Sequence, residues 1–253
     1  MNNAAESVQA PRREEKDLIV RTDYRILYED AWMLALDKPS PLPVHPVGRF
    51  TEKNLLSIVQ RDLNHKNLRI VNRLDSETSG VLLAAKTKEA ASGLASQFEA
   101  RTVHKEYAGI VLGIFPEKKG RFDGPLGYKI ENNYHLRTLD PEGESALTEY
   151  EVTKESGRFS LLRIIPRTGR MHQIRAHLAF SGHPLAGDKI YIDLDIYDRY
   201  VQHGWDDSML ATVKMPRLAL HASGLKIRHP GGGHWMEFYA PLPGEFLDFF
   251  RSS

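Results

Sequence analysis

The sequence contains no cysteine among its 253 residues. This absence excludes disulfide bonds, thiolate nucleophiles and zinc or iron–sulfur sites with cysteine ligands. No run reaches the roughly 20 apolar residues that a membrane-spanning helix requires. The apolar stretch of a secretory signal is also missing from the first residues, MNNAAESVQAPRREEKD. These absences are consistent with a cytoplasmic protein that does not contact a membrane.

The chain has almost no excess of either charge, with 34 lysines and arginines against 33 aspartates and glutamates. Only a local concentration of arginines could therefore bind a polyanion. The sequence has no G-x-x-x-x-G-K-[ST] loop, no G-x-G-x-x-G fingerprint and no G-x-S-x-G turn. His172 and His177 are five residues apart with no glutamate between them, so no metal site is expected.

The remaining composition, 41% hydrophobic and 26% charged, is that of a globular protein with enough apolar material for a core. The length suits one large domain, and we expect a polar tail at residues 1–22 before a single domain at 23–253. Runs of strand character occur at 24–30, 32–38, 81–86, 104–113, 145–154, 159–166, 218–230 and 234–241. Helical spacing or capping occurs at 55–63, 87–101, 171–181 and 241–252. This order predicts an α+β fold whose central sheet is mainly antiparallel.

The segment VNRLDSETSG, residues 71–80, places Arg73 and Asp75 directly before a buried strand. Two residues apart in an extended loop, their side chains point to the same side. A nearby arginine keeps an aspartate ionised and lowers its pKa. One interpretation is a surface ion pair worth roughly 0–1 kcal/mol. The other is a carboxylate held for chemistry, which the small residues after it favour because they let a ligand approach closely.

A second group of polar residues surrounds the start of the helix expected near Met171. Residues 161–190 contain five lysines and arginines against one acid, Asp188. Arginines at a helix N-terminus form a natural phosphate site, so this segment is the best candidate for contact with a nucleic-acid backbone. A solvated basic face is the alternative. The candidates for RNA contact are Arg167, Arg170 and His172, together with Thr78 in the first segment.

Tyr107, in the strand KEYAG, is the third candidate. A lone tyrosine in an apolar strand is usually a core residue. Its functional alternative is to stack on a base while its hydroxyl binds a polar partner.

These segments together resemble the signature motifs of pseudouridine synthases. NRLDSETSG is similar to their R-L-D-x-x-T-S-G motif. Four further segments resemble motifs of the large-subunit rRNA type, often called the RluA type: KPSPLPVHP, KEYAGIV, PRTGRMHQIRAHLAFSGHPLAGDKIY and RLALHASGLKI. The motifs are in the family's order and extend from about Tyr24 to Pro243.

The resemblance implies a monomeric isomerase with the pseudouridine synthase fold that converts uridine in rRNA or tRNA to pseudouridine. It implies one catalytic aspartate, Asp75, and no cofactor. Tyr107 would pack on the target uracil, Arg175 would pair with the catalytic carboxylate, and Arg73 would help to displace and hold the flipped-out nucleotide. Many relatives carry a small RNA-binding domain first. Residues 1–22 are too few for one, so we expect recognition to rest on the catalytic domain.

Three positions depart from the family pattern. Asn72 stands where histidine is commoner, Pro41 where glycine is common, and Ile192 where glycine is usual. None is a residue assigned to the chemistry, although Asn72 and Pro41 bear on which RNA is accepted. Two other hypotheses remain open: an inactive RNA-binding or RNA-folding protein with the same fold, and a hydrolase that releases uracil. The hydrolase would ordinarily need a second carboxylate, which the sequence does not reveal.

Overall fold

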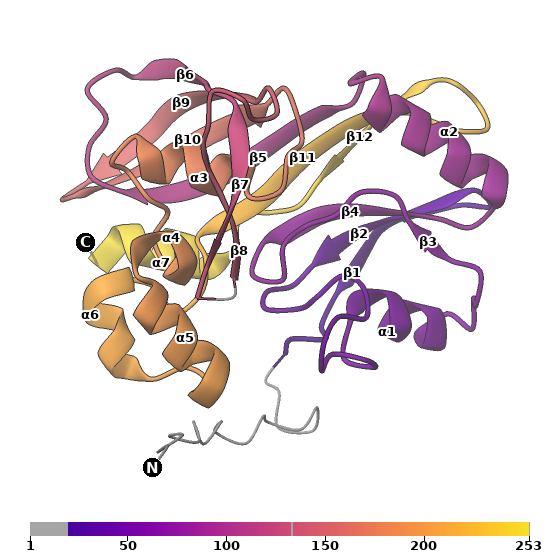
Figure 1. Cartoon of the computed structure of the whole chain (residues 1–253). Coiled ribbons are helices and arrows are strands. Elements are labelled where there is room, and N and C mark those ends of the chain that lie inside the picture. The colour runs from indigo at the N-terminus through magenta and orange to yellow at the C-terminus, as the bar shows by residue number, and fades with distance from the viewer. Residues whose placement is uncertain (1–19, 133, 253) are drawn as a thin grey trace, which may run out of the picture.

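A computed structural model describes residues 20–132 and 134–252 of the chain (Figure 1). Its main sheet has ten strands, in which β1-β2-β4-β11-β5-β10-β9-β6 are successive neighbours, β3 also pairs with β4, and β12 with β11. The strands are β1 (Arg25–Glu29), β2 (Met33–Lys38), β3 (Arg69–Ile70), β4 (Ser79–Ala85), β5 (His104–Leu112), β6 (Lys119–Asp123), β9 (Leu147–Ser156), β10 (Phe159–Pro166), β11 (Leu220–Arg228) and β12 (Trp235–Tyr239). All named pairings are antiparallel except that of β4 with β11, which confirms the predicted α+β fold with a mainly antiparallel mixed sheet.

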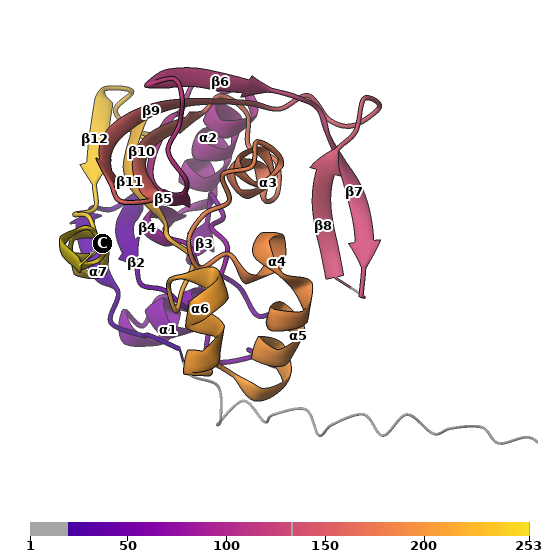
Figure 2. The same ribbon diagram turned by 90° about the vertical axis from the view of Figure 1, so that its left-hand side faces the viewer.

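Within the described residues, a hairpin, seven α-helices and a short 3-10 helix, Asp207–Met209, accompany the main sheet. The hairpin, β7 (Leu126–Glu131) and β8 (Tyr134–Leu139), forms a separate two-stranded sheet that stands off to one side (Figure 2). The helices are α1 (Leu55–Asp62), α2 (Lys88–Glu99), α3 (Gln173–Phe180), α4 (Lys189–Ile192), α5 (Leu194–His203), α6 (Leu210–Val213) and α7 (Gly244–Ser252). None of the helices in the described part of the chain is long and apolar enough to cross a membrane.

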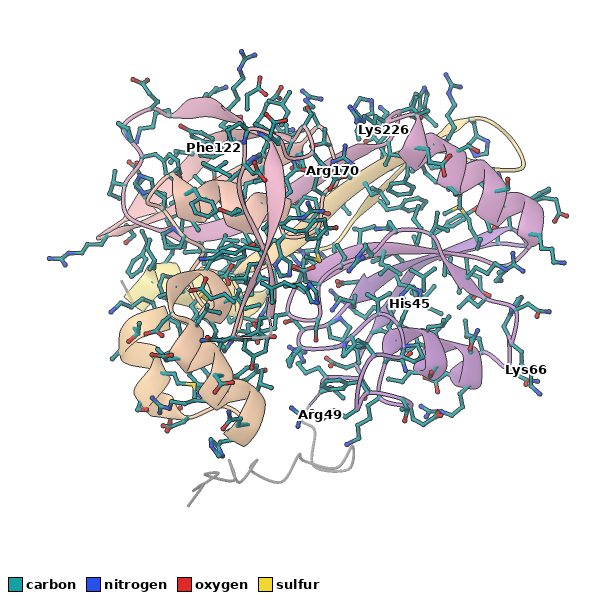
Figure 3. All side chains as sticks on the ribbon, viewed as in Figure 1. His45, Arg49, Lys66, Phe122, Arg170 and Lys226 are labelled. Atoms are coloured by element: carbon teal, nitrogen blue, oxygen red, sulfur yellow. The ribbon has the colours of Figure 1, made fainter. Side chains whose placement is uncertain are left out.

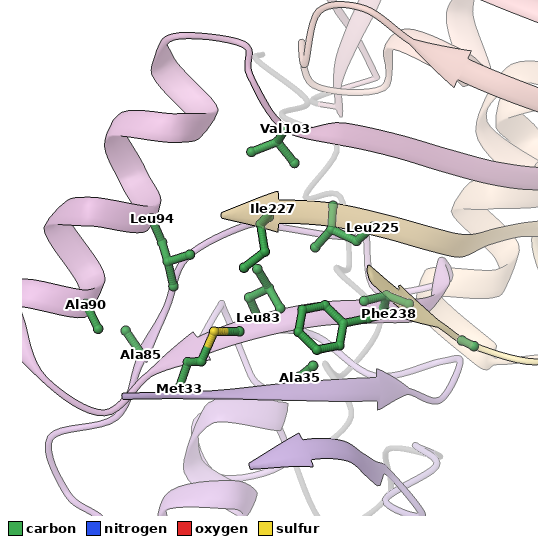
Figure 4. Packing of buried hydrophobic residues seen from close by; sticks show 12 residues of the cluster. Met33, Ala35, Leu83, Ala85, Ala90, Leu94, Val103, Leu225, Ile227 and Phe238 are labelled. Carbon is green, nitrogen blue, oxygen red and sulfur yellow. The ribbon is translucent and has the colours of Figure 1, made fainter. Parts of the chain in front are cut away.

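Alternate residues of β2 and β4 pack on opposite faces of the sheet, as the period of a strand requires. Met33 and Leu83 belong to a cluster with α2, which Figure 4 shows packed over β4 and β11. Leu34 and Leu82 belong to a second cluster with α1 on the other face. The predicted cap of α2 is confirmed, because the Thr87 hydroxyl accepts a hydrogen bond from the N–H of Ala90 at 3.0 Å.

The same alternation continues at the other end of the sheet. Val111 packs in a cluster with Ile174 and Leu178 of α3, whereas Ile110 packs with Phe246 and Phe250 of α7. The faces that carry α1 and α3 meet at the middle of the sheet, where the side chain of Tyr107 contacts both clusters. This position is where a cleft forms.

The parallel contact between β4 and β11 depends on a glycine. Gly80 has a φ of +107°, and a Cβ built on it would lie 2.2 Å from the carbonyl oxygen of Ala222 in β11. Only glycine allows this backbone conformation and this close approach. As a result β11 separates β4, which follows the loop carrying Asp75, from β5, which carries Tyr107.

The structure adds elements for which the sequence pattern gave no expectation. Helices α4, α5 and α6 lie between Lys189 and Val213. The helix expected to begin near Met171 is α3, which begins at Gln173. Residues 1–19 of the expected tail lie outside the described residues. Val20 packs against the cluster around α1, and the N–H of Arg21 donates to the carbonyl of Pro41 at 3.0 Å.

Candidate active site

A buried lysine, Lys38, fixes the loop that carries Asp75. The ammonium group of Lys38, at 0% exposure, donates to the carbonyl oxygens of Pro39, Leu42 and Ser76 at 2.9, 2.7 and 2.9 Å. Ser76 directly follows Asp75, whose own carbonyl accepts from the N–H of Thr78 at 3.0 Å. Lys38 thus holds the reactive loop against the proline-rich segment. The sequence analysis did not assign it this role, although a lysine at the end of a strand was visible there.

Arg175 joins two carboxylates across the cleft. Its Nη1 donates to Oδ2 of Asp75 at 3.0 Å, while Nε and Nη2 donate to the two oxygens of Asp188 at 2.8 and 2.7 Å. Asp188 is completely buried, whereas 23% of the Asp75 side chain is exposed. The planar guanidinium is therefore oriented by Asp188 and presents one N–H to Asp75. In the described part of the chain, Oδ1 of Asp75 makes no hydrogen bond, so this oxygen has no fixed partner.

Asp188 is a site residue that the sequence analysis missed. It entered there only as the single acid in a basic segment. Its carboxylate also accepts from the N–H of Tyr191, at 3.2 Å, as the N-cap of α4.

Burial opposes ionisation of Asp75, but neighbouring positive groups outweigh it and hold its pKa below the ordinary value of 3.8. These groups are His172 in its protonated form, Arg175 and Arg73. Burial lowers the pKa of His172 to about 4, so this imidazole is neutral at neutral pH. Arg175 is then the close cation that keeps the carboxylate ionised where the protein works.

These shifts predict how activity depends on pH. A carboxylate whose pKa is lower in the folded state stabilises the fold above its unfolded pKa, and this stabilisation is lost as pH falls through the folded pKa. For Asp75 the loss therefore begins only below about pH 4. We expect Asp75 to stay ionised above that pH, and kcat/KM to show no acidic limb from this group there. A profile of kcat/KM against pH checks this. If kcat/KM fell to half its plateau above about pH 5 while the protein stayed folded, the expectation would be contradicted.

His172 occupies a backbone conformation that non-glycine residues rarely adopt. Its φ is +52°, in the left-handed region, at the residue directly before α3. This conformation directs Nε2 to within 3.7 Å of Oδ2 of Asp75, while Nδ1 lies 3.4 Å from the hydroxyl of Tyr191. Such strain persists only where the surroundings hold it and is common at active sites. The structure thus brings His172 to the carboxylate.

Tyr107 lines the same cavity as Asp75. The cavity has a volume of about 270 Å³, and its walls include Arg73, Thr78 and Arg170. Burial, followed by the charge of Asp75, raises the pKa of Tyr107 far above its ordinary value, so the phenol stays neutral. Within the described residues its hydroxyl makes no hydrogen bond. An aromatic face beside a carboxylate, in a space of this size, suits one nucleoside.

The far wall of the cavity is organised by Gln173. Its side chain accepts from the Thr168 hydroxyl at 2.7 Å and from the N–H of Arg170 at 3.0 Å. Lys105 donates to the Thr168 carbonyl at 2.8 Å, and burial lowers the pKa of this lysine to about 8. Gln173 and Lys105 were not among the sequence candidates. Lys105 fixes the loop before α3 to strand β5, and Gln173 fixes it to strand β9 through hydrogen bonds to Leu147 and Thr148.

The basic segment at 161–190 is not an unpaired positive surface. Each of its five cations contacts a carboxylate from another segment: Arg163 with Glu106, Arg167 with Glu149, Arg170 with Glu144, Arg175 with Asp75, and Lys189 with Glu77. Arg170 lies between the two halves of the molecule in Figure 3 and lines the cavity. Arg167 lies outside the cavity linings.

Arg73 differs from these residues. It is exposed, it lines the cavity, and it makes no ion pair or hydrogen bond with residues 20–132 or 134–252. The sequence suggested an ion pair between Arg73 and Asp75, but the hydrogen-bonded partner of Asp75 is Arg175. Arg73 is therefore available to bind a phosphate.

The two histidines of α3's segment do not combine in a metal site. His177 is buried, and its ring nitrogens lie 2.9 Å from the Thr148 hydroxyl and 3.0 Å from the Gly124 carbonyl. No group of three or more potential ligands from histidine, cysteine, aspartate and glutamate occurs among the residues described. His177 thus acts in packing.

The fold and the cavity together define a protein that holds one aspartate, ionised and directed, at the floor of a space for a single nucleoside. The sequence profile of the family described as RNA pseudouridylate synthase matches residues 33–180. The Buchnera aphidicola (Acyrthosiphon pisum) protein named ribosomal large subunit pseudouridine synthase C is 34% identical over 231 residues, which cover 90% of this chain and 70% of that protein. The chain belongs to this family, whose members are isomerases acting on RNA.

Further comparisons agree. The Nitrosomonas europaea protein named ribosomal large subunit pseudouridine synthase D is 38% identical over 236 residues, covering 90% of this chain but 64% of that protein. The solved structure of human RNA pseudouridylate synthase domain containing 4 superposes with a TM-score of 0.70 at 26% identity, covering 89% of this chain and 91% of that one. The human domain containing 1 protein shares the fold, with a TM-score of 0.70 at 23% identity, covering 87% and 84%. The chain therefore spans about two thirds of the length of these bacterial relatives.

Proposed function

We propose that the chain converts specific uridines in ribosomal or transfer RNA to pseudouridine, with Asp75 as the catalytic group. The names of the relatives favour ribosomal RNA. The observation that carries the proposal is the arrangement at Asp75, where Arg175 binds one carboxylate oxygen and the partly exposed side chain lines the cavity. A protein that only binds RNA needs cations but gains nothing from a partly buried, ionised aspartate.

The proposed reaction breaks the bond between N1 of uracil and C1′ of ribose and forms a bond between C5 and C1′. Asp75 either attacks C1′ or removes a proton from C2′, and both steps require the ionised carboxylate. The proton leaves C5 and N1 gains one, so atoms and charge balance without an oxidant or cofactor. Arg175 keeps Asp75 ionised despite burial, and Tyr107 packs on the detached uracil while it turns.

The target uridine has to leave its helix or stack to reach Asp75, at a cost of a few kcal/mol. Contacts of Arg73 with the phosphate backbone offset part of this cost. Thr78, Arg170 and His172 complete the walls around the base. Arg167 pairs with Glu149 on the protein surface, so it contacts RNA only outside the cavity.

The proposal is tested by mapping pseudouridines in ribosomal and transfer RNA from cells with and without the gene. We expect one or a few positions to lose the modification in the deletion strain and to regain it with the wild-type gene. The Asp75→Ala gene is expected not to restore them. Unchanged maps in all strains would contradict the proposed function.

The ring of Tyr107 is expected to matter more than its hydroxyl. Tyr107→Ala removes the stacking surface and should lower kcat/KM roughly 10- to 100-fold, in line with ~1–3 kcal/mol for stacking of one base. Tyr107→Phe keeps the ring and should be affected less, because the hydroxyl has no partner in the described residues. Single-turnover kinetics on a substrate RNA measure both variants. An equal loss in the two would assign the role to the hydroxyl instead.

We infer that the chain acts as a monomer in the cytoplasm. Arg175 and Asp188 of the same chain already orient the Asp75 carboxylate, so the proposed reaction does not require a residue from a second copy. Light scattering measures the mass in solution, and a stable dimer would contradict the inference.

A further inference from the structure

A second cavity adjoins the first on the other side of Asp75. It has a volume of about 570 Å³ and lies between the segment Pro43–Val47, hairpin β7–β8 and helix α5. Figure 1 shows the hairpin and α5 in one half of the molecule, and Figure 3 places His45 in the other half, beside α1. The cavity is wider than the one that contains Tyr107, so a single uridine does not account for both.

The two cavities share a junction. Both are lined by Arg73, Leu74, Asp75, His172 and Arg175. Of the charged groups here, Asp75 and Arg175 bind each other, whereas Arg73 is exposed and has no partner among the described residues. Adjacent nucleotides in RNA are linked by one phosphate. An unpaired guanidinium between two nucleoside-sized spaces is located where that phosphate would lie.

The second cavity has aromatic walls. Tyr134, near the tip of the hairpin, packs edge-on against Tyr197 of α5, with ring centroids 4.7 Å apart. The Tyr134 hydroxyl donates to Asp198 at 2.8 Å, which holds the hairpin to α5. His45 lies on the opposite wall and is exposed. Partial loss of hydration of its ring, followed by the charge of Arg73, lowers the pKa of His45. Planar side chains without a fixed pattern of donors bind a base by stacking and tolerate any base.

We propose that this second cavity binds the base of a nucleotide adjacent to the target uridine, with Arg73 on the phosphate between them. This inference rests on the proposed function and adds a specific subsite to it. The protein then holds two unstacked nucleotides. One is the uridine that reacts, and the other fixes the position of the RNA strand relative to Asp75. Tyr134 is a positioning residue in this scheme, and its ring is the main contact.

The test uses three fluorescent RNA strands of seven nucleotides with equal backbone charge. Every position lacks a base except those named next. One carries a single uracil, and two carry an additional uracil directly 5′ or 3′ of it. Anisotropy titrations use the Asp75→Ala protein, in which no turnover occurs. We expect one of the two-base strands to bind about tenfold more tightly than the one-base strand, because a second base stacks.

Variants of the hairpin separate this subsite from general RNA affinity. Tyr134→Ala should abolish the gain from the second base, and Tyr134→Phe should keep it. Tyr128→Ala is the matched control, because Tyr128 belongs to the same hairpin and is 65% exposed but does not line the cavity. It should bind all strands like the parent.

Two results would overturn the inference: equal affinity for the one-base strand and both two-base strands, or an equal effect of Tyr134→Ala and Tyr128→Ala. Circular dichroism of each variant shows that it is folded. Failure of the proposed function would be seen separately, as unchanged pseudouridine maps, whereas failure of the subsite alone leaves those maps dependent on the gene.

Discussion

Asp75→Ala and Asp75→Asn are expected to lower pseudouridine formation by roughly 10⁴-fold or more, the scale seen when a single essential reactive group is removed. Asparagine keeps the shape of the side chain but loses the charge. It can neither attack C1′ nor accept a proton from C2′. Single-turnover assays with substrate RNA measure the loss. Binding of RNA, in contrast, should change little, because the phosphate contacts come from other residues.

Asp62→Ala is a suitable control, since Asp62 lies on α1 and pairs at the surface with Arg61. It should retain full activity. The same assays address the two alternatives to a synthase. A hydrolase would release free uracil, and an inactive RNA-binding protein would give the same zero rate with Asp75 as with alanine. Activity that survives Asp75→Asn would refute the assigned role of the carboxylate.

Arg175→Met is expected to destabilise the fold by about 3–5 kcal/mol, the usual cost of removing one partner from a buried charge cluster. The substitution leaves Asp188 fully buried and Asp75 largely buried with no guanidinium between them. The pKa of Asp75 should rise, because burial then acts without its closest opposing charge. The acidic limb of the pH–rate profile should therefore move to higher pH. Urea denaturation and a pH series measure the two effects.

Two further variants make this prediction specific. Arg167→Met removes a surface arginine that pairs with Glu149, and it should cost only ~0–1 kcal/mol. Adding Asp188→Asn to Arg175→Met removes the second buried charge and should recover part of the lost stability without restoring activity. If Arg175→Met proved as stable as Arg167→Met, the account of Arg175 as the central cation of the site would be wrong.

The local pattern was sufficient for most of the sheet. Alternation and turn residues located the strands around β2, β4 and β5, and Thr87 located the start of α2, because each depends on neighbours in sequence. Helices α4 to α6 were missed. The first and last have only four residues each, too short to show a helical period. Their existence depends on packing against the rest of the fold.

The partners of the charged residues, in contrast, could not be predicted from the local pattern. Five cations within residues 161–190 predicted a basic surface, yet each is paired with a carboxylate from elsewhere in the chain. An ion pair of Arg73 with Asp75 was one of two interpretations of the motif, but Arg73 is exposed at the junction of two cavities. Electrostatic partners are decided by distance in space, which spacing along the chain does not reveal.

The sequence by itself determined the mixed fold and the family, and its motifs proposed Asp75, Tyr107 and Arg175 as the site residues. Periodicity and motif order are local properties, and they survive without coordinates. Only the tertiary structure decided that Asp188 binds the other side of the Arg175 guanidinium, that Lys38 holds the loop that carries Asp75, and that a second cavity lies next to the first. These relations join segments tens of residues apart, and they exist only after strands β4, β11 and β5 align.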